Sequence, residues 1–241
     1  MKISLALLPA ELMADALRNS QVVVFDVLRA TSTMTTAMAA GAKQIHFFAS
    51  SDEALAARQH HPDALLCGEK GCLKVPGFDL GNSPLEFNSQ RIAGRRILMS
   101  TTNGTRAIHS ARMARRLFAG SLLNAQATAA ALAANTDDII LLCAGTDGAP
   151  AFEDMIGAGA VISELTKTAA KKKLLMSDLA WAAYYAFCGA ESDIQSALLV
   201  ARGAQNLVAA GLSPDIQHCC RLNALPTVVP INGDELATIL P

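Results

Sequence analysis

Short apolar runs rich in β-branched residues recur along the first part of the chain, separated by stretches with helical spacing of apolar positions. The pattern predicts strands at residues 2–7, 21–26, 44–48, 64–68, 95–100, 116–119 and 138–143. It predicts helices at residues 10–18, 31–40, 51–59 and 104–114, and a further helix that begins near Asn124. This alternation is typical of a parallel or mixed sheet covered by helices on both faces. We therefore expect an α/β fold with three αβα layers and a mostly parallel or mixed central sheet.

The last third of the sequence has a mainly helical pattern. Predicted helices cover residues 153–166, 177–187 and 193–210, with Ser177 as a cap and a possible break at Gly203, before an extended segment at 227–230. No low-complexity linker divides the chain. We expect a single domain over residues 1–241 with its helical last third packed on the sheet, although the pattern also allows two lobes.

Composition and charge narrow the class of protein. Hydrophobic residues make up 51% and charged residues 17% of the sequence, which argues for a folded core. The net charge is -1, and Lys and Arg are scattered apart from the run at 171–173, so we expect neither nucleic acid nor a membrane surface as a partner. Apolar runs are too short to span a bilayer, and the amino-terminal run is expected to be a strand. Six cysteines without zinc-ligand spacing favour buried free thiols. Because the chain shows neither a signal peptide nor a bilayer-spanning run, we expect a reducing, cytoplasmic location.

Asp26 ends a buried apolar run, and hydroxyl residues after it open the next predicted helix. This places the carboxylate at the end of a strand, beside the free N–H groups of a helix start, where an anion is favoured. A carboxylate beside an anion site points to a bridging metal. Mg²⁺ needs few protein carboxylates because water and substrate phosphate complete its shell. The alternative is that Asp26 caps the helix and Arg29 pairs with it.

Segment 100–106 (STTNGTR) follows another predicted strand and opens a helix. Hydroxyls, an amide, a glycine and a guanidinium at a helix start are suited to holding phosphate or sulfonate oxygens. The alternative is an extensively capped helix in which Arg106 is a surface residue.

Two further places contain candidate metal ligands. The long loop at 68–83 contains Glu69, which follows an apolar run as Asp26 does, so that both carboxylates can lie along the same edge of the sheet. In the same loop Asn82 and Ser83 either bind substrate or fix the turn before a proline. Glu153 and Asp154 open a helix, where one acid complements the helix dipole and the other is free to face a metal. Residues 215–220 (DIQHCC) lack the regular spacing of a zinc site.

Missing motifs exclude several mechanisms. The chain has no GxxxxGK[ST] segment, no complete serine elbow, no Cys-x5-Arg cradle and no second aspartate after Asp26 of the kind found in phosphoaspartate phosphatases. A P-loop NTPase and a covalent aspartyl-phosphate route therefore lose support.

Several long motifs together resemble the 2-phosphosulfolactate phosphatase family. They occupy residues 25–33 (FDVLRATST), 68–69, 77–84 (GFDLGNSP), 101–107 (TTNGTRA) and 120–125 (GSLLNA), and continue through 143–145 and 153–154. The resemblance covers most of the chain. It implies a Mg²⁺-dependent phosphatase on a three-layer α/β fold that hydrolyses the phosphate ester of 2-phospho-3-sulfolactate, a step of coenzyme M biosynthesis.

The resemblance also allows roles to be assigned as hypotheses. Asp26, Glu69 and one of Glu153 or Asp154 are expected to hold Mg²⁺. The expected catalytic residues are Asp26, Arg29, Glu69 and Asn103. The expected substrate-binding residues are Thr31, Ser32, Asn82, Ser83, Thr101, Thr102, Thr105 and Arg106. We favour attack by water assisted by the metal.

The sequence leaves three questions open. A covalent intermediate remains an alternative to direct attack by water. Another small acidic phosphoester, or non-catalytic binding of an anionic metabolite, remains an alternative function. Association as a homodimer is possible.

Overall fold

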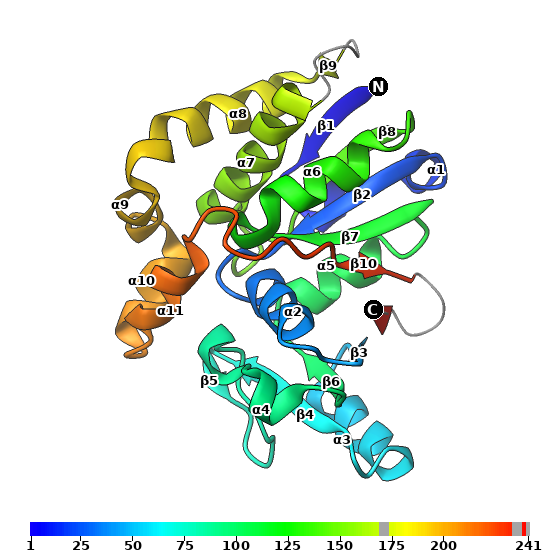
Figure 1. The fold of residues 1–241 in the computed structure, drawn as a ribbon, viewed down its shortest axis with the longest axis vertical. Coiled ribbons are helices and arrows are strands. Elements are labelled where there is room, and N and C mark those ends of the chain that lie inside the picture. The colour runs from blue at the N-terminus through cyan, green and yellow to red at the C-terminus, as the bar shows by residue number, and fades with distance from the viewer. Residues whose placement is uncertain (169–173, 233–237, 240–241) are drawn as a thin grey trace.

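The computed structural model describes residues 1–168, 174–232 and 238–239, with side chains to residue 232 (Figure 1). The lysine run at 171–173 lies outside the described residues. The described strands form two sheets. The larger sheet has the order β10 (Pro230–Ile231), β7 (Arg116–Gly120), β2 (Ser20–Phe25), β8 (Asp138–Cys143), β1 (Lys2–Ala6) and β9 (Leu175–Met176). The smaller has the order β11 (Thr238–Ile239), β3 (Gln44–Phe47), β6 (Arg96–Ser100), β4 (Leu65–Lys70) and β5 (Leu73–Lys74).

Both sheets are mixed, with parallel inner strands and antiparallel strands at every described edge except that of β9, which pairs in parallel with β1. Strand β2 pairs in parallel with β7 and β8, and β6 pairs in parallel with β3 and β4. Strands β5, β10 and β11 add antiparallel edges. Every residue of β2 is buried, as the continuous apolar run of a central parallel strand requires. The α/β class and the mixed sheet are confirmed.

The helices form layers around these sheets. Their bounds are α1 (Ala14–Leu17), α2 (Ala30–Ala39), α3 (Ser51–His60), α4 (Ser89–Ile92), α5 (Gly104–Ser110), α6 (Ala125–Ala133), α7 (Phe152–Thr168), α8 (Asp178–Ala190), α9 (Ile194–Leu199), α10 (Arg202–Ala209) and α11 (Ser213–Cys219). Helices α6, α7 and α8 cover one face of the larger sheet, and α2 and α5 cover the other (Figure 1). The three αβα layers are therefore present around this sheet.

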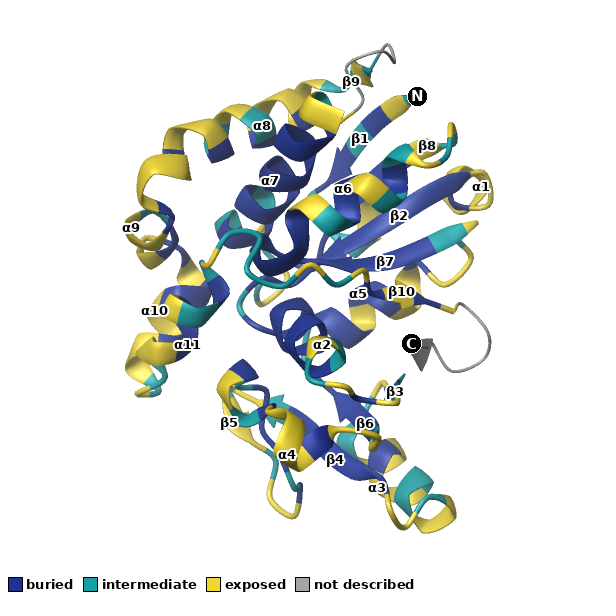
Figure 2. Cartoon of the chain, viewed as in Figure 1, coloured by how far each residue is buried: buried dark blue, intermediate teal, exposed yellow. Residues whose placement is uncertain are grey.

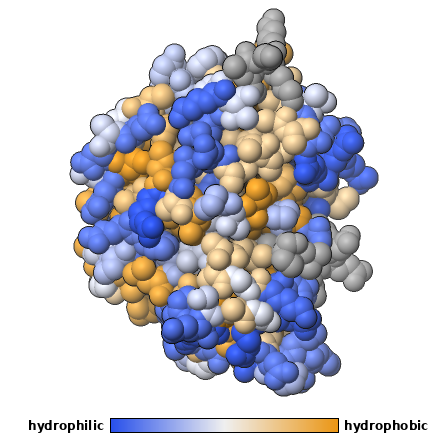
Figure 3. All heavy atoms as spheres, viewed as in Figure 1, coloured by the Kyte–Doolittle hydropathy of each residue, from blue (hydrophilic) through white to orange (hydrophobic). Residues whose placement is uncertain are grey.

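The smaller sheet is an extra layer. One face of the smaller sheet shares an apolar core with α2, α5 and the larger sheet. Helix α3 packs against the opposite face of the smaller sheet through a separate apolar cluster. The inner strands β2, β6, β7 and β8 and most of helix α7 are buried, whereas α8 exposes its outer side (Figure 2). The face seen in Figure 3 mixes hydrophilic and apolar residues. Among the described helices, none is long and apolar enough to cross a lipid bilayer.

Several local predictions were wrong in detail. The segment predicted as a helix at 10–18 is a 3-10 turn at Pro9–Glu11 followed by the short helix α1, because the extended backbone of Leu12 and Met13 separates the two. The loop at 68–83 contains the β4–β5 hairpin, and α11 was not predicted. Ser177 caps α8 as predicted, with its side chain accepting from the Ala180 N–H.

The break in the predicted helix 193–210 lies before Gly203. Ala201 is extended and separates α9 from α10, so Gly203 lies inside α10. A Cβ at this position would collide with Glu153 Oε1. Gly203 is therefore needed for the close approach of α10 to Glu153, and it does not end a helix.

Candidate active site

A cavity of about 110 Å³ lies where strands of both sheets end. Its walls come from the segments that follow β2, β6 and β8, from the β4–β5 hairpin, and from α10. The carboxyl ends of parallel strands are the usual position of a ligand site in open α/β sheets. Among the predicted site residues, the cavity lining includes Asp26, Arg29, Glu69, Asn82, Thr102 and Asn103.

Asp26 lies between two helix starts. Its Oδ1 accepts a hydrogen bond of 3.0 Å from the backbone N–H of Ala30, in the first turn of α2. At Gly104, the first residue of α5, a Cβ would stand 2.8 Å from Asp26 Oδ2, so only glycine permits this approach. Burial raises the pKa of Asp26 to about 6, and the nearby charge of Glu69 contributes. Asp26 therefore caps α2 and also faces the cavity.

Glu69 ties together two walls of the cavity. Its Oε1 accepts a hydrogen bond of 2.8 Å from the backbone N–H of Thr102, beyond β6. Its Oε2 accepts one of 3.0 Å from the backbone N–H of Cys72, in the β4–β5 hairpin. The sequence placed both acids at the same edge of one sheet, which was wrong: Asp26 follows β2 of the larger sheet and Glu69 lies in β4 of the smaller sheet, and the two meet in one cavity lining.

The two acids at the start of α7 differ in their surroundings. Asp154 accepts from the backbone N–H groups of Val27 (2.9 Å) and Gly145 (3.1 Å), and it joins the segments that follow β2 and β8. Burial, followed by the charge of Glu153 and then that of Asp26, raises its pKa well above the usual value. Both carboxylate oxygens of Asp154 thus accept hydrogen bonds from backbone N–H groups, which is typical of a residue with a structural role.

Glu153 keeps one oxygen free. Burial raises its pKa to about 6, and the charge of Asp26 contributes. Its Oε2 is buried without a hydrogen-bond partner, a costly state for a polar atom. Gly203, which lies against Glu153 Oε1, belongs to the cavity lining. Of the two acids, Glu153 is the better candidate for a cation ligand.

Arg29 is buried and is held by residues far away in the sequence. Its Nη1 lies 2.6 Å from Asp215 Oδ2, and its Nη2 donates to the carbonyl oxygen of Cys72 at 2.6 Å. Ser83 Oγ donates to the other oxygen of Asp215 at 2.6 Å. Arg29 therefore pairs with Asp215 and not with Asp26. Sequence reasoning missed this role of Asp215, because no local pattern links positions 186 residues apart.

Most predicted hydroxyl ligands satisfy backbone groups of their own turns. Thr31 Oγ1 donates to Asp26 O, Ser32 Oγ to Val27 O, and Thr105 Oγ1 to Thr101 O. Thr101 Oγ1 accepts from the N–H of Thr105. These bonds match the capping alternative. By contrast, Asn82 lines the cavity, and its Oδ1 is buried without a partner.

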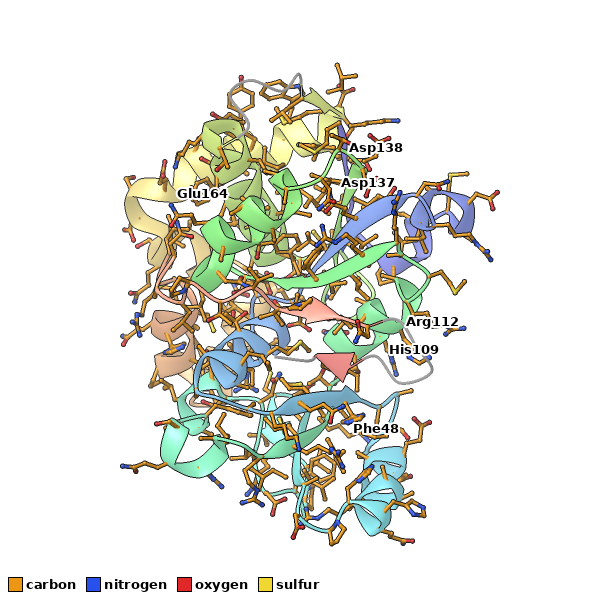
Figure 4. The ribbon with its side chains drawn as sticks, turned by 45° about the vertical axis from the view of Figure 1, so that its right-hand side comes forward. Phe48, His109, Arg112, Asp137, Asp138 and Glu164 are labelled. Atoms are coloured by element: carbon orange, nitrogen blue, oxygen red, sulfur yellow. The ribbon has the colours of Figure 1, made fainter. Side chains whose placement is uncertain are left out.

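Arg106 lies away from the cavity. Its side chain is exposed and borders a separate surface hollow together with His109 and Arg112. Figure 4 shows His109 and Arg112 at the surface of the molecule. The structure therefore does not bring the guanidinium of Arg106 to the other predicted site residues.

The cavity is acidic. Among the described residues that line it, the carboxylates are Asp26, Glu69 and Asp147, and the guanidinium is that of Arg29, which Asp215 already neutralises. An anion needs additional positive charge to enter such a site. No three His, Cys, Asp or Glu side chains of the described chain form a complete metal cluster. Mg²⁺ needs fewer, and the unpartnered Glu153 oxygen and the carboxylate of Asp26 fit its preference for oxygen ligands.

An α/β protein with an acidic, arginine-containing cavity at its strand ends has the architecture of a small-molecule enzyme. The sequence model described as 2-phosphosulpholactate phosphatase matches residues 6–234. A protein of Carboxydothermus hydrogenoformans named probable 2-phosphosulfolactate phosphatase is 43% identical over 89% of this chain and 88% of its own.

Proteins with the same name from Deinococcus radiodurans and Clostridium acetobutylicum are 38% and 34% identical. The alignments cover 95% of both chains for the former, and 98% of this chain and 100% of the relative for the latter. The chain belongs to the 2-phosphosulpholactate phosphatase family, and it is an enzyme of the phosphatase class.

Proposed function

We propose that this enzyme hydrolyses the phosphate ester of 2-phospho-3-sulfolactate to 3-sulfolactate and inorganic phosphate, with Mg²⁺ as cofactor. Family membership supports the substrate. The observation that carries the cofactor is the acidic cavity, in which carboxylates outnumber the guanidinium group at a site for a multiply charged anion.

Asp26 and Glu153 are the residues that would hold Mg²⁺, because both oxygens of Glu69, like those of Asp154, already accept from backbone N–H groups. When bound, the ion supplies positive charge that offsets the charge of the phosphoryl oxygens in the transition state. Arg29 adds N–H donors in the cavity wall, and its planar guanidinium suits phosphate oxygens. Asn82 offers a buried amide oxygen without a partner, which can accept a hydrogen bond from the substrate or from water.

Among the described residues that line the cavity, none resembles an activated protein nucleophile. Cys72 is the cysteine of the lining, and burial raises the pKa of its thiol, which disfavours the reactive thiolate. We therefore favour attack by water over a covalent intermediate.

The test is phosphate release from purified enzyme with 2-phospho-3-sulfolactate and with a simple alkyl phosphate, each with Mg²⁺ or with excess chelator. We expect the acidic ester to be preferred by about a hundredfold in kcat/KM, because a site built for several anionic groups rejects ligands that leave its cations unpaired. Equal efficiency on both esters would point to another phosphoester. Binding without turnover on any ester would indicate an anion-binding protein.

Two further proposals concern the cellular location and the oligomeric state of the enzyme. All six cysteines are free thiols, which supports a cytoplasmic location.

Association as a homodimer also stays a proposal. Helix α8 exposes Trp181 and Tyr185 in stacked contact, with ring centroids 5.7 Å apart, and light scattering of the purified protein would test self-association.

A further inference from the structure

A carboxylate from helix α11 is buried beside the cavity arginine. The side chains of Asp215 and Arg29 are each 3% exposed, and 186 residues separate them in the sequence. Burying two charges has a large desolvation cost, and a pair of this kind is weak evidence for stability alone. The pair therefore calls for an explanation beyond the attachment of α11 to the rest of the fold.

The contacts of Asp215 fix the plane of the guanidinium. Asp215 Oδ2 holds Nη1 of Arg29, while Oδ1 is held by Ser83 Oγ, so the carboxylate itself is anchored at both oxygens. The carbonyl oxygen of Cys72 holds Nη2. A guanidinium has five N–H donors, so these two bonds leave others for a ligand in the cavity that Arg29 lines.

Other carboxylates line the same cavity as this guanidinium. Asp26, Glu69 and Asp147 share the lining with Arg29, so their negative charges attract it. An arginine without a fixed counterion would turn toward these acids, because its long side chain can adopt many rotamers. Such a pairing would occupy the donors meant for substrate.

We propose that Asp215 is the positioning residue of Arg29: its carboxylate holds the guanidinium away from Asp26 and Glu69 and presents the remaining N–H donors to the phosphate. This inference rests on the proposed function, since it assigns Arg29 to the phosphate. It assigns a specific role to a residue of α11, in the part of the chain where sequence motifs give least information.

The test is a double-mutant cycle on the full chain with Asp215→Asn, Arg29→Gln and the combined variant. The readout is the dissociation constant of inorganic phosphate at saturating Mg²⁺, measured by calorimetry well below the unfolding temperature. Asp215→Asn is expected to weaken phosphate binding by about tenfold when Arg29 is present and to have no effect when Gln replaces it. A residue that acts through Arg29 must show this dependence, whereas a merely structural residue must not.

Ser83→Ala is a second variant that keeps both charges and frees one oxygen of Asp215. We expect it to weaken phosphate binding about threefold, again only when Arg29 is present. The matched control is Asp79→Asn, which removes another ion pair, 2.7 Å from Arg58, at a position outside the cavity lining. This variant is expected to lower the unfolding temperature and to leave phosphate binding unchanged.

Three outcomes would each overturn the inference. Asp215→Asn could have equal effects with Arg29 and with Gln at position 29, or it could leave the dissociation constant of phosphate unchanged or lower it. The third outcome is that the wild type does not bind phosphate. Failure of the proposed function has a different signature. In that case the wild type would bind phosphate and show the dependence on Arg29, yet release no phosphate from 2-phospho-3-sulfolactate.

Discussion

Asp26 and Gly104 approach so closely that a Cβ on residue 104 would stand 2.8 Å from Asp26 Oδ2 and 2.6 Å from the Cβ of Ala30. The start of α5 is thereby packed directly against the carboxylate that ends β2. Because β2 belongs to the larger sheet and the strand before α5 to the smaller, this contact joins the two sheets at the cavity.

Gly104→Ala is therefore expected to damage the site. The added methyl group must displace backbone or the Asp26 carboxylate, so we expect a loss of about 1–3 kcal/mol in the free energy of unfolding and a fall of at least about tenfold in kcat. The matched control is Gly189→Ala in α8, where a Cβ would meet no atom within 4 Å. Urea unfolding and turnover of both variants check this, and an unimpaired Gly104→Ala enzyme would contradict the role of the contact.

Asp26→Asn separates charge from shape. The amide oxygen retains the ability to accept from the Ala30 N–H, so the variant should melt within a few degrees of the wild type. We expect kcat to fall at least about a hundredfold, the scale of losing a principal electrostatic contact. Thermal unfolding and turnover are the measurements. A variant that melts early but keeps its specific activity would show that Asp26 serves mainly as a cap.

Metal removal tests the acidic cavity directly. Without a divalent cation the lining carboxylates repel an anionic substrate, so excess chelator should abolish activity and added Mg²⁺ should restore it. The assay must be paired with a measurement of residual metal content. Full turnover by demonstrably metal-free enzyme would refute the cofactor assignment.

Glu153 and Asp154 should respond in opposite ways to neutralisation. Glu153→Gln removes a buried charge that has an unpartnered oxygen, so we expect a large loss of Mg²⁺ affinity and little change in unfolding temperature. Asp154→Asn weakens the acceptor for two buried backbone N–H groups, so we expect a loss of about 1–3 kcal/mol in unfolding free energy. Calorimetric Mg²⁺ titration and urea unfolding distinguish the two, and the reverse pattern would exchange their roles.

Arginine substitutions test which guanidinium serves the phosphate. Arg29→Ala should reduce kcat/KM at least about a hundredfold, because it removes the cation of the cavity lining. Arg106→Ala changes an exposed side chain outside that lining and should leave kcat/KM within about twofold. The measurement is kcat/KM of both variants on the same phosphate ester, which shows which arginine contacts the phosphate. A comparable loss in Arg106→Ala would mean that α5 moves toward the cavity when substrate binds.

The sequence by itself determined the local elements and the end-of-strand acids. The run that ends at Asp26 is a buried strand, the hydroxyl residues after it open a helix, and Ser177 caps α8. These features follow from apolar periodicity and from side chains that bond their own backbone, interactions that span only a few residues. The sequence also placed Glu69, like Asp26, after an apolar run, but only the packing of the two sheets brings these acids into one cavity lining.

Tertiary structure decided what these groups contact. The strand pattern alone did not predict two sheets, because pairing depends on which strands lie side by side and not on the spacing of apolar residues. The choice between Glu153 and Asp154, adjacent in the sequence, depends on backbone N–H groups supplied by Val27 and Gly145. The pairing of Arg29 with Asp215 exists only because folding brings α11 to the cavity, where a buried cation requires a counterion that local sequence cannot specify.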